Sequence, residues 1–226
     1  MIMIASYLTR VVGVAAVTAL SLLVPPAGVP TASAEGCPDV EVVYARGTFA
    51  PQGMNGPGLD FVNDLTAKVG GKSVGAYSVV YPASINFPRA VEGIADAAQH
   101  VENMAATCPK TKMVLTGYSQ GAAVIGFVTN NAVPGGVDPA EVPPPMPPSV
   151  ASHVAAVVLL GKPDPTFMEG IDQPPINIGP LYTSKTLELC APGDPICSDG
   201  DTRGAHQSYT AIGMTDQGAA FAASKV

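Results

Sequence analysis

The chain has 226 residues, with 11 lysine and arginine residues against 18 aspartate and glutamate residues, so its formal net charge is −7 at neutral pH. This acidic balance argues against nucleic-acid binding and against electrostatic docking on anionic lipid, because both partners need a positive protein surface. It places no restriction on the binding of uncharged small molecules.

Residues 1–34 are predicted to be a signal peptide rather than part of the fold. Arg10 is the only charged residue among them, the apolar run 11–24 is too short for a comfortable membrane span, and Ala32-Ser33-Ala34 is a small-x-small cleavage site. An uncleaved N-terminal anchor is the alternative. We therefore expect a secreted protein, extracellular or associated with the cell envelope, whose mature part, residues 35–226, forms one domain.

In chain order, the hydrophobic pattern predicts a strand at 40–45, a helix at 58–69, a strand at 74–80, a helix at 88–106, a strand at 112–116, a helix at 122–129, strands at 153–160 and 186–189, and a helix at 215–225. The helix at 88–106 is the clearest, because its apolar residues recur at intervals of three and four. Strands that alternate with helices predict an α/β protein with a central, mainly parallel sheet flanked by helices on both faces.

Two proline-rich segments interrupt this alternation. Residues 134–148 are predicted to be an extended surface loop, either a passive linker or a flap over a site. Residues 163–180 are predicted to be irregular as well.

The four cysteines, Cys37, Cys108, Cys190 and Cys197, all lie in the mature part. In an exported protein this even count predicts two disulfides, for which three pairings exist. A local bridge between Cys190 and Cys197 across a Pro-Gly-Asp-Pro turn is the easy choice, and it leaves Cys37 with Cys108. The spacing fits no zinc pattern, and we expect neither a metal nor another cofactor.

The most informative motif is Gly117-Tyr118-Ser119-Gln120-Gly121, between the predicted strand at 112–116 and the predicted helix at 122–129. Such a turn is too tight for side chains on the neighbouring backbone, hence the two glycines, and it exposes the serine oxygen above the sheet. By chance the same pattern also occurs as a glycine-rich turn with a solvated serine. The strand-turn-helix setting favours a nucleophile.

A serine nucleophile needs an imidazole that accepts its proton. His100 is predicted to be a solvated helical residue, and His153 opens a strand at the end opposite the one where catalytic groups collect in a parallel sheet. His206 follows a glycine-rich loop and alone fits the order serine, acid, histidine along the chain. His206 is therefore the predicted base.

The carboxylate that orients this imidazole should follow a strand later than the nucleophile's own. Asp164 comes after the predicted strand at 153–160, and Asp194 comes after the one at 186–189. Either could be an ordinary turn aspartate. We favour Asp194, because a bridge across its turn would hold the carboxylate rigidly and because it lies shortly before His206.

Acyl transfer also needs donors aimed at the oxyanion of the tetrahedral intermediate. The backbone N–H of Gln120, directly after the nucleophile, is one expected donor. Thr48, in the loop after the first strand, offers an N–H and a hydroxyl as the second. The alternative interpretation of Thr48 is a plain turn residue.

Together these motifs resemble the cutinases, and especially the secreted cutinase-like esterases of actinobacteria. The resemblance spans nearly the whole mature chain and rests on Val43-Tyr44-Ala45-Arg46-Gly47-Thr48, Gly117-Tyr118-Ser119-Gln120-Gly121, the segment from Cys190 to Cys197, and His206-Gln207-Ser208-Tyr209. It implies a small α/β-hydrolase fold, a catalytic triad of Ser119, Asp194 and His206, oxyanion donors at Thr48 and Gln120, and two disulfides. It also favours Asp194 over Asp164.

The chain departs from the fungal members of that family just before the histidine. Fungal cutinases carry an apolar segment there, whereas residues 198–205 are polar and charged. We therefore do not expect hydrolysis of insoluble cutin. Phe49, Ile85 and Phe87 are candidates to line an acyl pocket.

The sequence predicts a monomeric serine esterase that hydrolyses carboxylic esters of short to medium acyl chains through an acyl-enzyme on Ser119. The alternatives are a lipase or phospholipase A, or an acyltransferase, acting on long-chain lipids with transient contact to a lipid surface. A secreted surface protein with a vestigial site is a further alternative. The presence of all the triad and oxyanion residues argues against it.

Overall fold

The computed structural model describes residues 36–226 apart from residues 136 and 203, so the signal peptide predicted at 1–34 lies outside the described residues. Five parallel strands form one sheet in the order β2-β1-β3-β4-β5. The strands are β1 (Val40–Ala45), β2 (Val74–Ser78), β3 (Lys112–Tyr118), β4 (Val154–Leu160) and β5 (Thr186–Leu189). Because all five run the same way, their carboxyl ends meet at one edge of the sheet.

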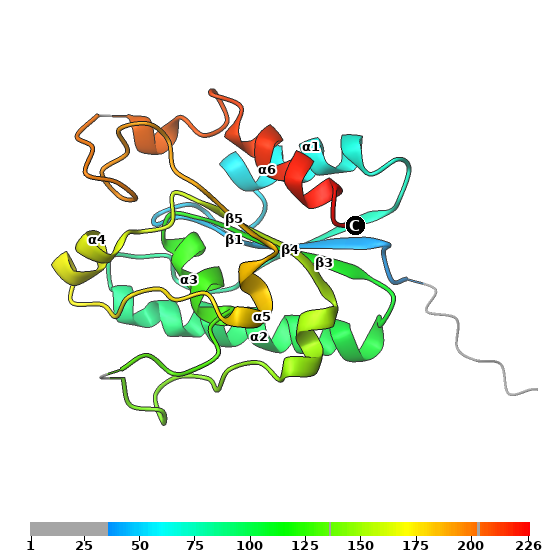
Figure 1. The fold of residues 1–226 in the computed structure, drawn as a ribbon, viewed down its shortest axis with the longest axis horizontal. Coiled ribbons are helices and arrows are strands. Elements are labelled where there is room, and N and C mark those ends of the chain that lie inside the picture. Colours follow the sequence, from blue (N-terminus) through cyan, green and yellow to red (C-terminus); the bar gives the residue numbers. More distant parts are fainter. Residues whose placement is uncertain (1–35, 136, 203) are drawn as a thin grey trace, which may run out of the picture. The chain divides into compact units, whose positions relative to one another are not determined.

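Helices cover both faces of the sheet, as Figure 1 shows with α1 and α6 on one side and α2 and α3 on the other. The helices are α1 (Gly56–Lys68), α2 (Ala90–Thr107), α3 (Gln120–Val128), α4 (Pro165–Gly170), α5 (Pro180–Thr183) and α6 (Met214–Ala223), with 3-10 helices η1 (Phe87–Arg89), η2 (Pro148–Ser152) and η3 (Ala205–Gln207). This arrangement confirms the predicted α/β class and its parallel sheet.

The core consists of two apolar layers, one on each face of the sheet. On β1, Val43 and Ala45 pack with residues of α2 and α3, whereas Val42 and Tyr44 pack with residues of α1 and α6. This division follows from the two-residue period of a strand, which sends successive side chains to opposite faces. Burial on both faces explains why the predicted strands read as continuous apolar runs.

The prediction that residues 163–180 are irregular is wrong in part, because α4 lies within this segment. Asp164 is the N-cap of α4, and its carboxylate accepts a hydrogen bond of 2.7 Å from the N–H of Phe167. Pro165 occupies the first turn, where a proline costs no hydrogen bond. The proline-rich composition predicts irregular structure, whereas here a proline begins a helix.

Two disulfides tie the fold together. Cys37 is joined to Cys108, which brings the segment before β1 to the end of α2, and Cys190 is joined to Cys197 in the loop after β5. Within residues 36–226, leaving aside 136 and 203, no helix has the length and apolarity needed to cross a membrane.

Candidate active site

Ser119 lies in the turn between β3 and α3, with φ 56° and ψ −121°. A β-carbon added to Gly121 would lie 1.9 Å from the carbonyl oxygen of Ala45, and one added to Gly117 would lie 2.2 Å from the oxygen of Gly121. Both approaches are to backbone atoms, so neither contact can be relieved by a side-chain rotation. The two glycines of the motif are therefore required by the tightness of the turn.

Three side chains from separate loops meet at the carboxyl edge of the sheet. The Nε2 atom of His206, on η3, lies 2.8 Å from Oγ of Ser119, and its Nδ1 atom lies 2.7 Å from Oδ2 of Asp194, in the loop after β5. A carboxylate can only accept, so Nδ1 carries the proton and Nε2 is free to accept the serine proton. The arrangement can therefore turn the hydroxyl of Ser119 into a nucleophile.

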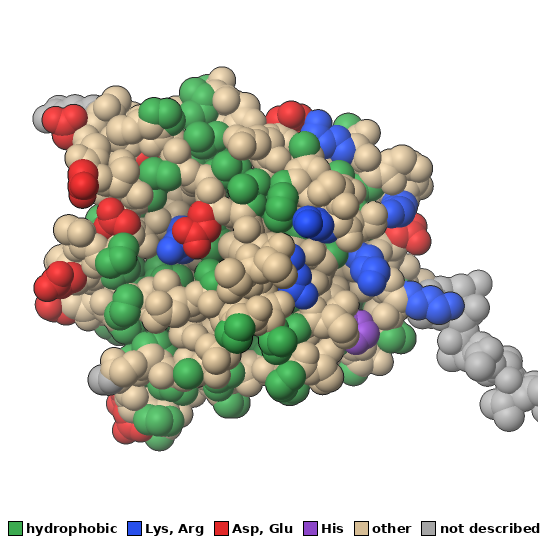
Figure 2. Space-filling model, in the orientation of Figure 1, with side chains coloured by type: hydrophobic (Ala, Val, Ile, Leu, Met, Phe, Trp, Pro, Cys, Tyr) green, Lys and Arg blue, Asp and Glu red, His purple; other side chains and the backbone are tan. Residues whose placement is uncertain are grey.

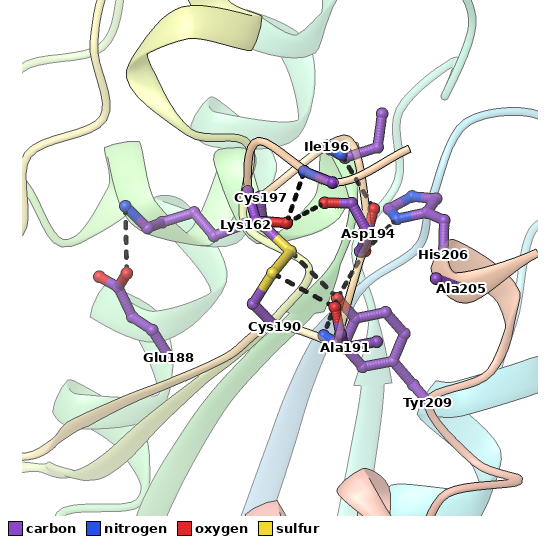
Figure 3. The surroundings of a disulfide bond; sticks show 12 residues. Lys162, Glu188, Cys190, Ala191, Asp194, Ile196, Cys197, Ala205, His206 and Tyr209 are labelled. Carbon is purple, nitrogen blue, oxygen red and sulfur yellow. Dashed lines mark hydrogen bonds and ion pairs between the residues drawn. A yellow bond between two sulfur atoms is a disulfide. The ribbon is translucent and has the colours of Figure 1, made fainter. Parts of the chain in front are cut away.

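Asp194 is completely buried, and several donors hold its carboxylate in place. Besides His206, the hydroxyl of Tyr209 donates to Oδ2 at 2.7 Å and the N–H of Ile196 donates to Oδ1 at 2.9 Å. Figure 3 shows these contacts beside the Cys190–Cys197 disulfide, which closes the turn around Asp194. A buried anion is tolerated when it is hydrogen-bonded in this way.

Tyr209 belongs to one of the motifs that carry the family resemblance, but it is not among the functional residues that the sequence predicts. Its side chain is completely buried. Burial first, and then its hydrogen bond to Asp194, raise the pKa of Tyr209 above the ordinary value for tyrosine. The hydroxyl therefore stays protonated and remains a donor to Asp194. Its place in the motif at 206–209 is a sequence signal, but its hydrogen-bond partner is set by the packing of two loops.

Tyr118, next to Ser119, contacts the imidazole of His206 from another side. Its ring stacks on that of His206 with centroids 5.0 Å apart, and its hydroxyl donates to the carbonyl oxygen of His206. Burial, followed by the charge of Asp194, raises the pKa of Tyr118 to about 12. Tyr118 and Tyr209 together leave the imidazole little freedom to turn.

Thr48 and Gln120 both lie beside Ser119 in the wall of one cavity. Within the described residues, the N–H groups of Thr48 and Gln120 donate to no other protein group. Gln120 opens α3, where the first N–H groups of a helix have no partner within the helix. A β-carbon on Gly47 would lie 2.8 Å from the ring of Tyr118, so the loop that carries Thr48 packs directly on the turn that carries Ser119.

The cavity that contains Ser119 and His206 has a volume of about 1120 Å³ and mainly apolar walls. The proline-rich segment forms part of its wall and contributes Pro134, Val137, Val142 and Met146 among other residues. Of the two interpretations of residues 134–148, a passive linker and a flap over a site, this position agrees with a segment that shapes the site. Whether it moves stays a prediction.

Of the three residues predicted to line an acyl pocket, only Phe87 does so. The prediction is wrong for Phe49 and Ile85, which do not line this cavity and are 76% and 68% exposed. Phe49 has φ 63°, and its N–H donates to the oxygen of Ala83 at 2.7 Å, so its backbone is held in a conformation that turns the ring outward.

The remaining candidates of the sequence lie elsewhere. Asp164 caps α4 and does not contact His206. His153 precedes β4, at the edge of the sheet opposite Ser119. His100 was predicted to be solvated, and this is wrong: its ring stacks on Tyr77 with centroids 3.6 Å apart, and its Nε2 atom lies 3.2 Å from Oε1 of Glu41.

Comparisons with known proteins agree with this geometry. Residues 36–226 match the family model described as Cutinase. The chain is 56% identical over 167 residues to the probable carboxylesterase Culp5 of Mycobacterium tuberculosis, covering 74% of this chain and 95% of Culp5. It is 46% identical over 224 residues to carboxylesterase Culp1 of the same organism, covering 97% of this chain and 96% of Culp1.

A solved structure agrees as well. The cutinase of Trichoderma reesei in complex with a C11Y4 phosphonate inhibitor is similar to this chain with a TM-score of 0.62 and 30% sequence identity, covering 82% of this chain and 75% of that one.

Proposed function

Because the chain belongs to the cutinase family, we propose that this serine esterase cleaves carboxylic esters through an acyl-enzyme on Ser119, with His206 and Asp194 as its partners. One observation carries the proposal: an unbroken hydrogen-bonded chain runs from Oγ of Ser119 through His206 to Asp194, at 2.8 and 2.7 Å. The Ser119 end of this hydrogen-bonded series lies at the cavity, beside the N–H groups of Thr48 and Gln120, which donate to no other protein group within the described residues.

In the first half of the reaction, Nε2 of His206 takes the proton of Ser119 as Oγ attacks the ester carbonyl. The buried carboxylate of Asp194 stabilises the imidazolium that forms and fixes its orientation. The oxyanion is held by the N–H groups of Thr48 and Gln120. Collapse of the intermediate returns the proton from His206 to the departing alcohol and leaves the acyl group on Ser119.

In the second half, His206 takes a proton from water as the water attacks the acyl-enzyme. The acid is released, the proton returns to Oγ of Ser119, and the site is restored. Besides the ester and this water, each step uses side chains and backbone groups of the chain.

The substrate class is proposed to be esters of short to medium acyl chains. The cavity volume of about 1120 Å³ lies slightly above the roughly 300–1,000 Å³ common for small-molecule pockets, and its apolar walls suit an acyl chain. The relatives named as carboxylesterases support an ester substrate.

Hydrolysis of nitrophenyl esters from acetyl to palmitoyl tests this proposal, with the mature oxidised protein and its Ser119→Ala variant in parallel. We expect turnover that depends on Ser119 and peaks at a short or medium chain. A maximum at palmitoyl would favour the lipase or phospholipase alternative. Equal background rates for both proteins would contradict the serine mechanism.

We also propose that the protein is secreted as a monomer after removal of residues 1–34. Both disulfides agree with an oxidising compartment. Protein recovered from the culture medium should then begin at Glu35 and elute as a monomer in size-exclusion chromatography. Recovery only from the cell envelope, with Met1 retained, would instead indicate an anchor.

A further inference from the structure

Arg46 is a buried cation directly after β1, and only 4% of the residue is exposed. Its guanidinium donates from Nε to the oxygen of Ala50 at 2.8 Å, and from Nη1 to Oε1 of Gln52 at 2.6 Å and to the oxygen of Val79 at 3.3 Å. Its Nη2 donates to the oxygen of Tyr81.

Within the described residues, none of the ion pairs involves Arg46. A buried charge without a counterion is costly, and an apolar side chain of similar size would fill the space at lower cost. The guanidinium N–H groups of Arg46 therefore indicate a role other than packing. They hold several carbonyl groups in fixed positions.

The groups that Arg46 contacts belong to two different loops. We call residues 46–52, which follow β1 and carry Thr48, the oxyanion loop, and residues 79–84, which follow β2, the bracing loop. Arg46 donates to both, its guanidinium lies 4.8 Å from the centroid of the Tyr81 ring, and the hydroxyl of Tyr81 donates back to the oxygen of Arg46. Arg46 is thus a cross-link between the two loops.

The same two loops meet again beside the nucleophile. The N–H of Phe49 donates to the oxygen of Ala83 at 2.7 Å, and the side-chain amide of Gln120 donates to the oxygen of Ser84 at 2.9 Å. Phe49 and Ala83 have φ of 63° and 48°. Residues other than glycine rarely adopt such angles, and they keep them only where the surrounding structure imposes them.

From these contacts we infer that Arg46 is a positioning residue for the oxyanion hole: by joining the oxyanion loop to the bracing loop, it holds the N–H of Thr48 at its place relative to Ser119. The inference rests on the proposed function, because it assumes that Thr48 and Gln120 bind the oxyanion. Arg46 itself does not line the cavity, so it acts through Thr48 and not through contact with substrate.

The test is Arg46→Lys, which keeps the positive charge but replaces five donors in a planar fork by a single ammonium group that cannot span both loops. An oxyanion donor acts in the transition state, so kcat should fall while KM stays within about twofold. A donor that is misplaced by about 1 Å lowers kcat on the order of a hundredfold. The exposed Arg89, which pairs with Glu92, supplies the matched control Arg89→Lys, with kcat unchanged.

A second variant, Gln52→Met, keeps the side-chain volume and removes the acceptor that Nη1 of Arg46 uses in the oxyanion loop. It also removes the side-chain amide of Gln52, which donates to the carbonyl oxygens of Ser78 and Val79 and so belongs to the same brace between the two loops. It should lower kcat by about tenfold, again with KM nearly constant. Circular dichroism and thermal unfolding identify variants that do not fold. If Arg46→Lys fails to fold, Gln52→Met decides the question alone.

Folded variants whose kcat stays within about twofold of the wild-type value would overturn the inference, even if their unfolding temperatures fall, because that result means a purely structural role. Failure of the proposed function looks different. In that case the wild-type protein would hydrolyse no ester, or Ser119→Ala would retain the wild-type rate.

Discussion

The two aspartates that the sequence leaves as candidates differ sharply in their surroundings. Asp194 is completely buried and accepts from His206, Tyr209 and Ile196, whereas Asp164 accepts from the N–H of Phe167 at the start of α4. The same residue type in similar proline-containing turns thus has two different tasks. Only the contacts made after folding separate them.

Exchange of each aspartate for asparagine should reveal this difference. Asp194→Asn leaves His206 without an orienting anion, so kcat should fall by about 10⁴ with little change in KM. Asp164→Asn keeps a good N-cap and should change kcat by less than about threefold. Ester hydrolysis over a range of substrate concentrations gives kcat and KM for both variants. Similar losses for the two variants would contradict the assignment of Asp194.

Tyr209 permits a prediction about pH. Its pKa is raised in the folded protein, so its contribution to stability is complete below the unfolded value of about 10 and is lost as the pH rises through the folded value. The free energy of unfolding should therefore decline above about pH 10, and less steeply in Tyr209→Phe. Urea unfolding at a series of alkaline pH values measures this. Identical slopes for the two proteins would contradict the role given to the Tyr209 hydroxyl.

Residues of the site could be predicted where a short motif or the order along the chain marks them, and not where only contacts between distant segments do. Ser119 is marked by a motif and His206 by chain order, and the structure brings both together with Asp194. Their catalytic roles stay predictions. Tyr209 was missed and His100 misjudged because a hydrogen bond across two loops, or a ring stacked on Tyr77, leaves no trace in periodicity.

At the scale of elements, the turn from β3 to α3 is the most constrained part of the fold. Gly121 approaches the backbone of the loop after β1 so closely that no β-carbon fits. Gly170, at the end of α4, has open space where its β-carbon would stand. The two glycines therefore form a matched pair for testing the tightness of the turn.

Gly121→Ala should destabilise the protein by about 3 kcal/mol or more, because backbone and not a flexible side chain blocks the added methyl group. Gly170→Ala should be neutral or stabilising by up to about 1 kcal/mol. Urea unfolding compares the two free energies. A stable and fully active Gly121→Ala would show that the turn is looser than the structure indicates.

The helices and strands could largely be predicted, since each is specified by a short local pattern. The five predicted strands agree with the sheet, because strands covered on both faces are continuous apolar runs. The short α4 was missed because a proline-rich composition is typical of irregular segments. The sequence left open whether residues 134–148 are a linker or lie over the site, because the choice depends on where α2 and α3 lie in space.

Charge is distributed unevenly over the whole molecule. Figure 2 shows acidic side chains gathered along the edge where α4 and the proline-rich segment lie in Figure 1, and basic side chains toward the opposite end. Asp138, Glu141, Glu169 and Asp172 line the cavity, and no lysine or arginine is found among its described lining residues. Anionic substrates should therefore meet a repulsive field at the cavity.

At low ionic strength, an ester with an anionic alcohol group should be cleaved with a kcat/KM about fivefold below that of its neutral isostere. The difference should nearly vanish at about 0.5 M salt, where screening is strong. The double variant Asp138→Asn and Glu141→Gln should reduce the discrimination and leave the neutral ester unaffected. Equal rates for both esters at low salt would show that the acidic residues of the cavity wall have no influence on the choice of substrate.

The central claim is that Ser119 is the nucleophile of a preorganised site, and reaction with a nitrophenyl alkylphosphonate tests it most directly. Oγ of Ser119 should displace nitrophenolate from phosphorus and retain the phosphonyl group. We predict one phosphonyl group per chain by intact mass, on the peptide that contains Ser119, and none in Ser119→Ala or in protein unfolded in urea. Equal labelling of wild type and Ser119→Ala, or a label on another residue, would contradict the account.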